Sequence, residues 1–163
     1  MQPVPRILGL DVGTRTIGVA VSDPMGWFAR GVTTVQRQSW KADLAQLKAI
    51  LKQYEVAQLV VGLPLGSNGE MTEQARYSRG AAERIIKEFP HLQLSYIDES
   101  YSTESAKASL RATGMKRRKQ KALIDQQAAV HILQDFLDQE QRRQEAQNRE
   151  ANRQLLANNN TTN

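Results

Sequence analysis

The sequence predicts an α/β domain built on a five-stranded mixed sheet that is flanked by helices. Two observations support this class: three strand-like segments open the chain, and helical and strand patterns then alternate. A length of 163 residues with 40% hydrophobic residues is enough for one domain with one core. We expect this domain over residues 1–139, followed by a polar tail, residues 140–163, that is disordered or a frayed helix.

The opening segments have the pattern of an antiparallel meander. Residues 6–12 and 17–22 are apolar runs joined by turn residues at 13–16, which predicts a hairpin. A third strand is expected at 30–35, after the chain is broken by proline and glycine at 24–26.

The rest of the domain alternates helices with strands. Ser39 is expected to cap a helix whose apolar residues fall on one face: Trp40, Leu44, Leu47, Leu51 and Tyr54. The remaining expected elements are a central parallel strand at 58–63, helices at 72–89 and 103–112, a strand at 92–97, a loop at 114–121 and a last helix at 122–138. A meander followed by such β-α-β units is the ribonuclease-H-like order of elements.

The excess positive charge of the chain lies in one short run. The formal net charge is +5, and without this run the 17 remaining basic residues would equal the 17 acidic ones. The run consists of Lys116, Arg117, Arg118, Lys119 and Lys121. This location favours contact with a polyanion such as nucleic acid, although an ordinary solvated loop is the alternative. Arg15, in the hairpin turn, either touches substrate or belongs to a plain turn.

The composition also excludes several kinds of site. The chain has no cysteine and only two histidines, which excludes disulfides and thiolate sites and leaves oxygen ligands for any metal. No window approaches the roughly 20 apolar residues of a membrane span, and the N-terminus lacks the pattern of a signal peptide. We therefore expect a cytoplasmic protein without a membrane partner.

Three acidic residues occupy positions where an isolated charge is costly. Asp11 ends an apolar strand, Glu99 follows the fifth strand, and Asp125 lies four residues before Ala129 on the apolar stripe of the last helix. Each has a structural alternative, as a turn residue, a loop residue or a residue that complements the helix dipole. Together they would repel one another unless a cation joined them, which predicts catalytic ligands for Mg²⁺ or Mn²⁺.

Four blocks of the sequence resemble those of one known family. They are LGLDVGTRTIGVAVSD (8–23), VVGLPLGSNGEMTEQA (60–75), IDESYSTESA (97–106) and KALIDQQAAVHIL (121–133). In this order and spacing they are similar to the YqgF/RuvX family, described as Holliday junction resolvases of the ribonuclease-H superfamily and as pre-16S rRNA nucleases. The resemblance covers residues 6–138.

The resemblance implies roles for the same three acids. Asp11 is similar to the metal ligand of the family's first strand, Glu99 to its second acid and Asp125 to its helix-borne third acid. Two positions depart from the family pattern: Ser100 replaces the usual Arg, and Gly66 replaces the usual Asn. Neither departure removes one of the implied ligands.

These observations lead to one principal hypothesis and several alternatives. The principal one is a Mg²⁺-dependent endonuclease for structured nucleic acid that processes the 5′ end of pre-16S rRNA. Its closest alternative is a Holliday junction resolvase in DNA recombination or repair, which would favour a homodimer making paired cuts. An actin-like kinase or ATPase shares the Asp-x-Gly-Thr motif but needs a second lobe, for which 163 residues are too few. A non-catalytic RNA-binding module is the third possibility.

Overall fold

The sheet of this protein confirms the predicted five-stranded mixed architecture. The computed structural model describes residues 2–99 and 116–160, apart from the side chains of Arg118, Lys121 and Asn160. Its strands are β1 (Arg6–Val12), β2 (Thr16–Ser22), β3 (Ala29–Gln36), β4 (Val56–Leu63) and β5 (Gln93–Asp98). Its described helices are α1 (Trp40–Gln53), α2 (Glu73–Glu88) and α4 (Arg117–Asn160). The helix expected at 103–112 lies outside the described residues.

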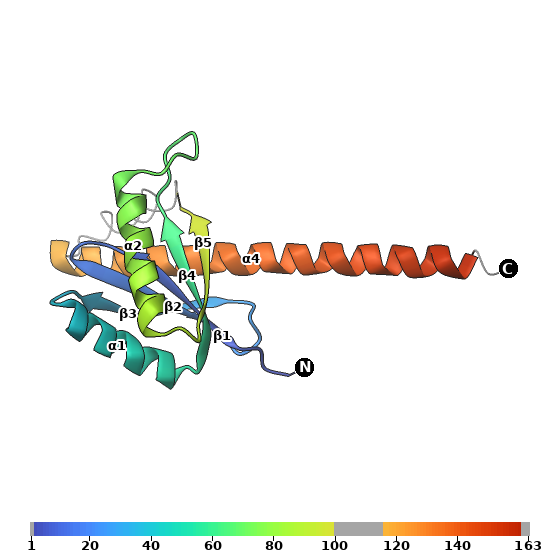
Figure 1. The fold of residues 1–163 in the computed structure, drawn as a ribbon. Helices are drawn as coiled ribbons and strands as arrows, with labels where there is room; N and C mark the ends of the chain where they lie inside the picture. The colour runs from blue at the N-terminus through green and yellow to red at the C-terminus, as the bar shows by residue number, and fades with distance from the viewer. Residues whose placement is uncertain (1, 100–115, 161–163) are drawn as a thin grey trace.

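The strand order is β3-β2-β1-β4-β5, which places β1 at the centre of the sheet (Figure 1). The first three strands form the predicted antiparallel meander, and β4 runs parallel to both β1 and β5. The carboxyl ends of β1, β4 and β5 therefore meet at one edge of the sheet. Ligands of open α/β sheets gather at such an edge, so it is where a functional site is expected.

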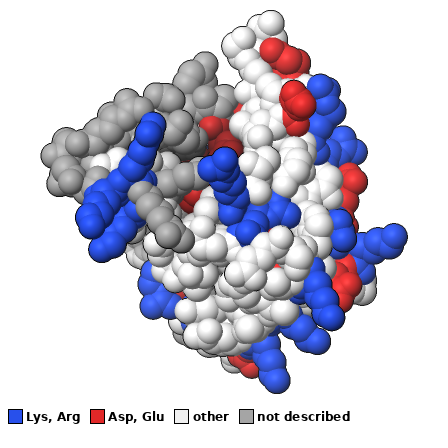
Figure 2. Space-filling view, turned by 90° about the vertical axis from the view of Figure 1, so that its left-hand side faces the viewer, with Lys and Arg blue, Asp and Glu red and all other residues white. Residues whose placement is uncertain are grey.

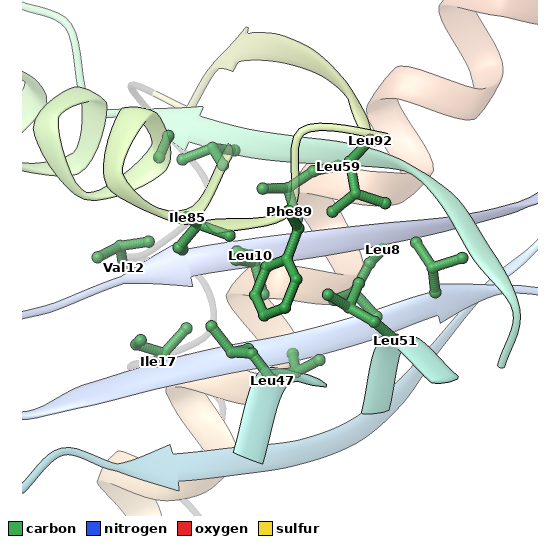
Figure 3. Close-up of a cluster of buried hydrophobic side chains, with 14 of the residues drawn as sticks. Leu8, Leu10, Val12, Ile17, Leu47, Leu51, Leu59, Ile85, Phe89 and Leu92 are labelled. Carbon is green, nitrogen blue, oxygen red and sulfur yellow. The ribbon is translucent and has the colours of Figure 1, made fainter. Parts of the chain in front are cut away.

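Helices cover both faces of the sheet and bury two separate apolar clusters. Side chains such as Leu8, Leu10 and Val12 of β1 pack under α1 and α2 (Figure 3). The alternate residues of β1 face α4, where Ile7 packs on the second cluster and Gly9 lies against Leu133. Asp11 continues this second series, because successive side chains of a strand alternate between faces.

The predicted apolar faces of α1 and α2 and the predicted cap of α1 are confirmed. The Ser39 hydroxyl accepts a hydrogen bond from the Ala42 amide at 3.2 Å, which fixes the first turn of α1. Thr72 caps α2 in the same way, at 3.0 Å from the Ala75 amide. The predicted inward residues of α2 are all buried: Ala75, Ser78, Ala82, Ile85 and Phe89.

The last helix differs from its predicted bounds at both ends. It begins at Arg117, so most of the basic run that was expected in a loop forms its first turns. Lysine, arginine and glutamine are good helix formers, and nothing after Gly114 interrupts them. The predicted inward stripe is confirmed, since Ala129, Ile132, Leu133, Phe136 and Leu137 are all buried.

At its other end α4 continues well beyond the domain (Figure 1). Residues 142–159 are exposed, yet they form a regular helix instead of the expected disordered or frayed tail. Pairs spaced three or four residues apart support it, including Arg149–Glu145 at 3.8 Å and Arg153–Glu150 at 3.2 Å. None of the helices in the described part of the chain is long and apolar enough to cross a membrane.

Because residues 142–159 of α4 are exposed, removal of this projecting part should hardly affect stability. We expect a chain truncated after Gln144 to melt within about 2 °C of the full chain in a thermal unfolding experiment. Leu133→Ala, which empties a buried position, should lower stability by about 2–5 kcal/mol and serves as the positive control. A truncated chain that melts as low as Leu133→Ala would show that the projecting helix stabilises the domain.

Candidate active site

Two of the predicted acids meet at the carboxyl edge of the sheet. Asp11 lies near the end of β1 and faces α4. Glu99 follows β5, and its amide donates a hydrogen bond to the Leu63 carbonyl at 3.1 Å, which holds it at the end of β4. The Asp11 and Glu99 side chains are joined by a hydrogen bond. Strand pairing therefore brings together two carboxyl groups that are 88 positions apart in the chain.

The surroundings of this carboxyl pair disfavour two negative charges. Burial raises the pKa of Glu99 to about 8, and the charge of Asp11, the hydrogen bond with Asp11 and the charge of Asp98 act in the same direction. The Oε2 atom of Glu99 is buried, and it lies beside Gly62 of β4. Near neutral pH the pair therefore holds a proton between two acids.

A divalent cation is the natural replacement for that proton. The pair offers only oxygen ligands, which suit hard cations such as Mg²⁺ and Mn²⁺. A cation would also remove the repulsion that raises the pKa of Glu99. The donor atoms and their electrostatics thus fit the metal that the sequence predicted.

The third predicted acid faces the same side of the sheet but has another neighbour. The Thr16 hydroxyl donates a hydrogen bond to Oδ2 of Asp125. A Cβ added to Gly18 would collide with the Asp125 carbonyl group, so α4 touches the backbone of β2 at this point. Gly18 is also the register partner of Asp11. Asp125 therefore sits over the strand next to Asp11.

The structure brings Asp11 and Glu99 together and holds Asp125 nearby on Thr16. Among residues 2–99 and 116–160, no three acidic or histidine side chains form a group that could hold a metal ion. The site is thus a carboxyl pair with a third carboxylate on the same face. Sequence analysis did not identify Thr16 or Gly18, although the small alternating residues of β2 (Gly18, Ala20, Ser22) were a usable sign of close helix packing.

A half-buried arginine, Arg37, which was not predicted as a site residue, fixes the turn beside Asp11. The Arg37 Nη1 atom donates to the Gly13 carbonyl at 3.1 Å, and the Arg37 amide donates to the Arg15 carbonyl at 2.9 Å. Its Nε atom forms an ion pair at 3.0 Å with Asp43, which is 1% exposed. Arg37 thereby joins the β1–β2 turn to the start of α1.

The predicted phosphate-binding residues lie at the same end of the molecule. Arg15 is exposed in the β1–β2 turn, and Lys116, Arg117 and Lys119 are exposed at the start of α4. The Arg118 and Lys121 side chains fall outside the described part of the structure. Figure 2 views this end and shows acidic side chains in a recess between basic ones. Anionic substrate would therefore meet cations before it reaches the carboxyl pair.

The unusual Gly66 lies in the loop between β4 and α2. A Cβ at this position would collide with the carboxylate of Glu70, which folds back over the glycine. The Gly66 amide donates to the Glu70 carbonyl at 2.9 Å, and the Gly69 amide donates to the Gly66 carbonyl at 2.8 Å. The Glu70 carboxylate thus occupies the space that a side chain at position 66 would need. Ser100, the other departure, lies outside the described residues.

Comparison with known proteins shows which family the chain matches. Residues 5–139 match the model of a family described as RuvX, Holliday junction resolvase. A protein of Moorella thermoacetica, named as a candidate pre-16S rRNA nuclease, is 47% identical over 133 residues, which cover 82% of this chain and 94% of the relative. Its counterpart in Syntrophomonas wolfei has the same kind of name and is 42% identical over 133 residues, with the same coverage.

Solved structures show the same fold at low sequence identity. The RuvC protein of T. thermophilus, in complex with a Holliday junction substrate, has a TM-score of 0.51 and 16% identity, covering 81% of this chain and 93% of that one. A fowlpox virus resolvase bound to Holliday junction DNA has a TM-score of 0.50 and 10% identity, covering 82% and 97%. These likenesses confirm the ribonuclease-H-like fold.

The carboxyl pair predicts a pH dependence of stability in the presence of EDTA. Glu99 has an ordinary pKa of 4.5 and a folded pKa of about 8, so between these values the folded state binds more protons than the unfolded state. The melting temperature should therefore fall as pH rises from about 4.5 to 8. Glu99→Gln should remove most of this slope, whereas Glu150→Gln on the projecting helix should keep it. Equal slopes in wild type and Glu99→Gln would contradict the repulsion described above.

The contact of α4 with β2 predicts a large effect of one methyl group. Gly18→Ala should push the Asp125 region away from the sheet, costing about 1–3 kcal/mol of stability and much of any nuclease activity. Gly80→Ala is the matched control, because nothing lies within 4 Å of a Cβ at that exposed helical position. It should instead stabilise the protein by about 0.5–1 kcal/mol. If both variants have the stability and the activity of the wild type, the close approach is not required.

Proposed function

Because the chain belongs to the RuvX family of Holliday junction resolvases, we propose that it is a metal-dependent endonuclease that processes the 5′ end of pre-16S rRNA. The observation that carries this proposal is the contact of Asp11 with Glu99 at the carboxyl edge of the sheet. A purely structural role would not explain why two half-buried acids lie together where ligands of this sheet class bind.

The chemistry we propose is hydrolysis of a phosphodiester bond. Asp11 and Glu99 would hold Mg²⁺ or Mn²⁺, and the Asp125 carboxylate would join them from its place on Thr16. Bound divalent cations activate water and stabilise the leaving oxygen in such reactions. The protein supplies oxygen ligands in half-buried surroundings, and the reaction needs no histidine or cysteine nucleophile.

Cations at the start of α4 are proposed to hold the substrate backbone. Lys116, Arg117 and Lys119 are exposed, and the first turn of α4 contains no acidic residue. Positive side chains at this end add to the positive end of the helix dipole, which lowers helix stability and strengthens attraction for phosphate. Together with Arg15, Arg118 and Lys121, they would contact phosphates without reading sequence.

The substrate and location belong to the same proposal. Relatives that are 40–47% identical are named as candidate pre-16S rRNA nucleases, which favours an rRNA precursor in the cytoplasm. The description of the matching family favours a second candidate, resolution of Holliday junctions in DNA recombination or repair. That activity would call for a homodimer, because a junction is resolved by paired cuts.

One assay tests the activity and separates the two substrates. Purified protein with Mg²⁺ or Mn²⁺ should cleave a pre-16S rRNA fragment, and Asp11→Asn should abolish cleavage while binding changes little. Asp135→Asn, which removes an exposed carboxylate of α4, should retain activity. Cleavage of a four-way DNA junction instead would favour the resolvase. RNA binding without metal-dependent cleavage of either substrate would indicate that the protein is a non-catalytic RNA-binding module.

A further inference from the structure

A second basic surface lies on the other face of the sheet, between α1 and α2. It is a groove of about 430 Å³, and the lining residues that matter here are Trp40, Lys41, Lys48, Arg84 and Glu88. Three of the four charged residues are cations. This groove is separate from the start of α4, where the basic run lies.

The exposed charges of α1 are all positive. Lys41, Lys48 and Lys52 are exposed, whereas the helix's one acid, Asp43, is buried and paired with Arg37. Within the described part of the chain, neither Lys41 nor Lys48 forms an ion pair with an acid. The positive charge on this side of the groove therefore remains available to an anionic partner.

A row of stacked side chains connects the groove with the turn beside Asp11. The guanidinium groups of Arg37 and Arg84 each lie 4.5 Å from the centre of the Trp40 ring. Arg37 also donates to the Gly13 carbonyl in the β1–β2 turn. Arg84 is exposed, so its planar donors can bind a phosphate while its face rests on Trp40. Arg37 and Trp40 thus link Arg84 to the turn that follows Asp11.

We propose that the groove between α1 and α2 binds the sugar–phosphate backbone of the substrate strand outside the cleavage site. This inference rests on the proposed nuclease function. Lys41, Lys48 and Arg84 place three cations along one groove that contains a single acid, Glu88. This excess of positive charge complements the repeated negative charges of a phosphate backbone.

The test compares long and short substrates in wild type and Lys41→Gln/Lys48→Gln/Arg84→Gln. In EDTA, fluorescence anisotropy should show about ten-fold or more weaker binding of a long RNA that extends beyond the cleavage site. The slope of log affinity against log salt should fall by about two units. A short RNA confined to the cleavage site should bind equally to both proteins, and with Mg²⁺ its kcat and KM should be unchanged.

A charge-matched control distinguishes RNA binding by the groove from general electrostatic attraction between RNA and the protein. Arg142→Gln/Arg149→Gln/Arg153→Gln removes three cations from the projecting helix and should leave binding of the long RNA unchanged. Equal weakening by both triple variants, or none by the groove variant, would overturn the proposal. The double variant Lys41→Gln/Lys48→Gln changes only exposed side chains and replaces the triple variant if loss of the Arg84–Trp40 stack impairs folding.

Two further outcomes keep this inference distinct from the proposed function. Failure of wild type to cleave would overturn the nuclease proposal, while the anisotropy comparison would still test the groove. A poly-glutamate peptide that binds wild type but not the groove variant, with long RNA bound equally by both, would reassign the groove to an acidic protein and overturn the inference.

Discussion

The contact between Asp11 and Glu99 is the interaction on which the functional arrangement depends. It exists because β1 is flanked by β2 on one side and by the parallel strand β4 on the other, with β5 beyond β4. The amide of Glu99 extends the β4–β5 pairing by one bond, to the Leu63 carbonyl. The energy that buries two acids together thus comes from apolar strands and sheet hydrogen bonds elsewhere. The fold accepts a local electrostatic cost that only a cation or a proton relieves.

The second constraint is the close packing of α4 on the central strands. Added Cβ atoms at Gly9 and Gly18 would overlap atoms of α4, because the helix lies directly against the strand backbones there. That approach brings the Asp125 side chain within reach of Thr16 on β2. A larger residue at Gly18 would overlap the α4 backbone at Asp125 and push this part of the helix, with its carboxylate, away from the sheet. Small residues on one face of β2 therefore determine how near the helix-borne acid comes to the carboxyl pair.

Local pattern was sufficient for most of the fold and for part of the site. Apolar runs bounded by turn residues identified the central strands, and apolar spacing with Ser39 identified α1. The identity of Asp11 and Glu99 as partners followed from their positions at strand ends. Local pattern could not predict the contacts between distant segments, which are those of Thr16 with Asp125 and of Arg37 with Gly13. The extent of α4 was missed because hydrophobic periodicity ends near residue 138, while charge pairs continue to Arg153 and the helix to Asn160.

The distribution of charge at this end of the molecule follows from the different solvation of acids and bases. Acids proposed to hold a metal would gain from partial burial, since low solvation strengthens their interaction with a cation. Bases proposed to hold phosphate would gain from exposure, because their long side chains must reach a substrate that stays in water. Asp11 and Glu99 are accordingly half-buried, while Arg15, Lys116 and Arg117 are exposed. Nucleic acid would therefore be held at a rim of flexible cations, while its scissile bond is brought to rigid carboxylates fixed by the sheet.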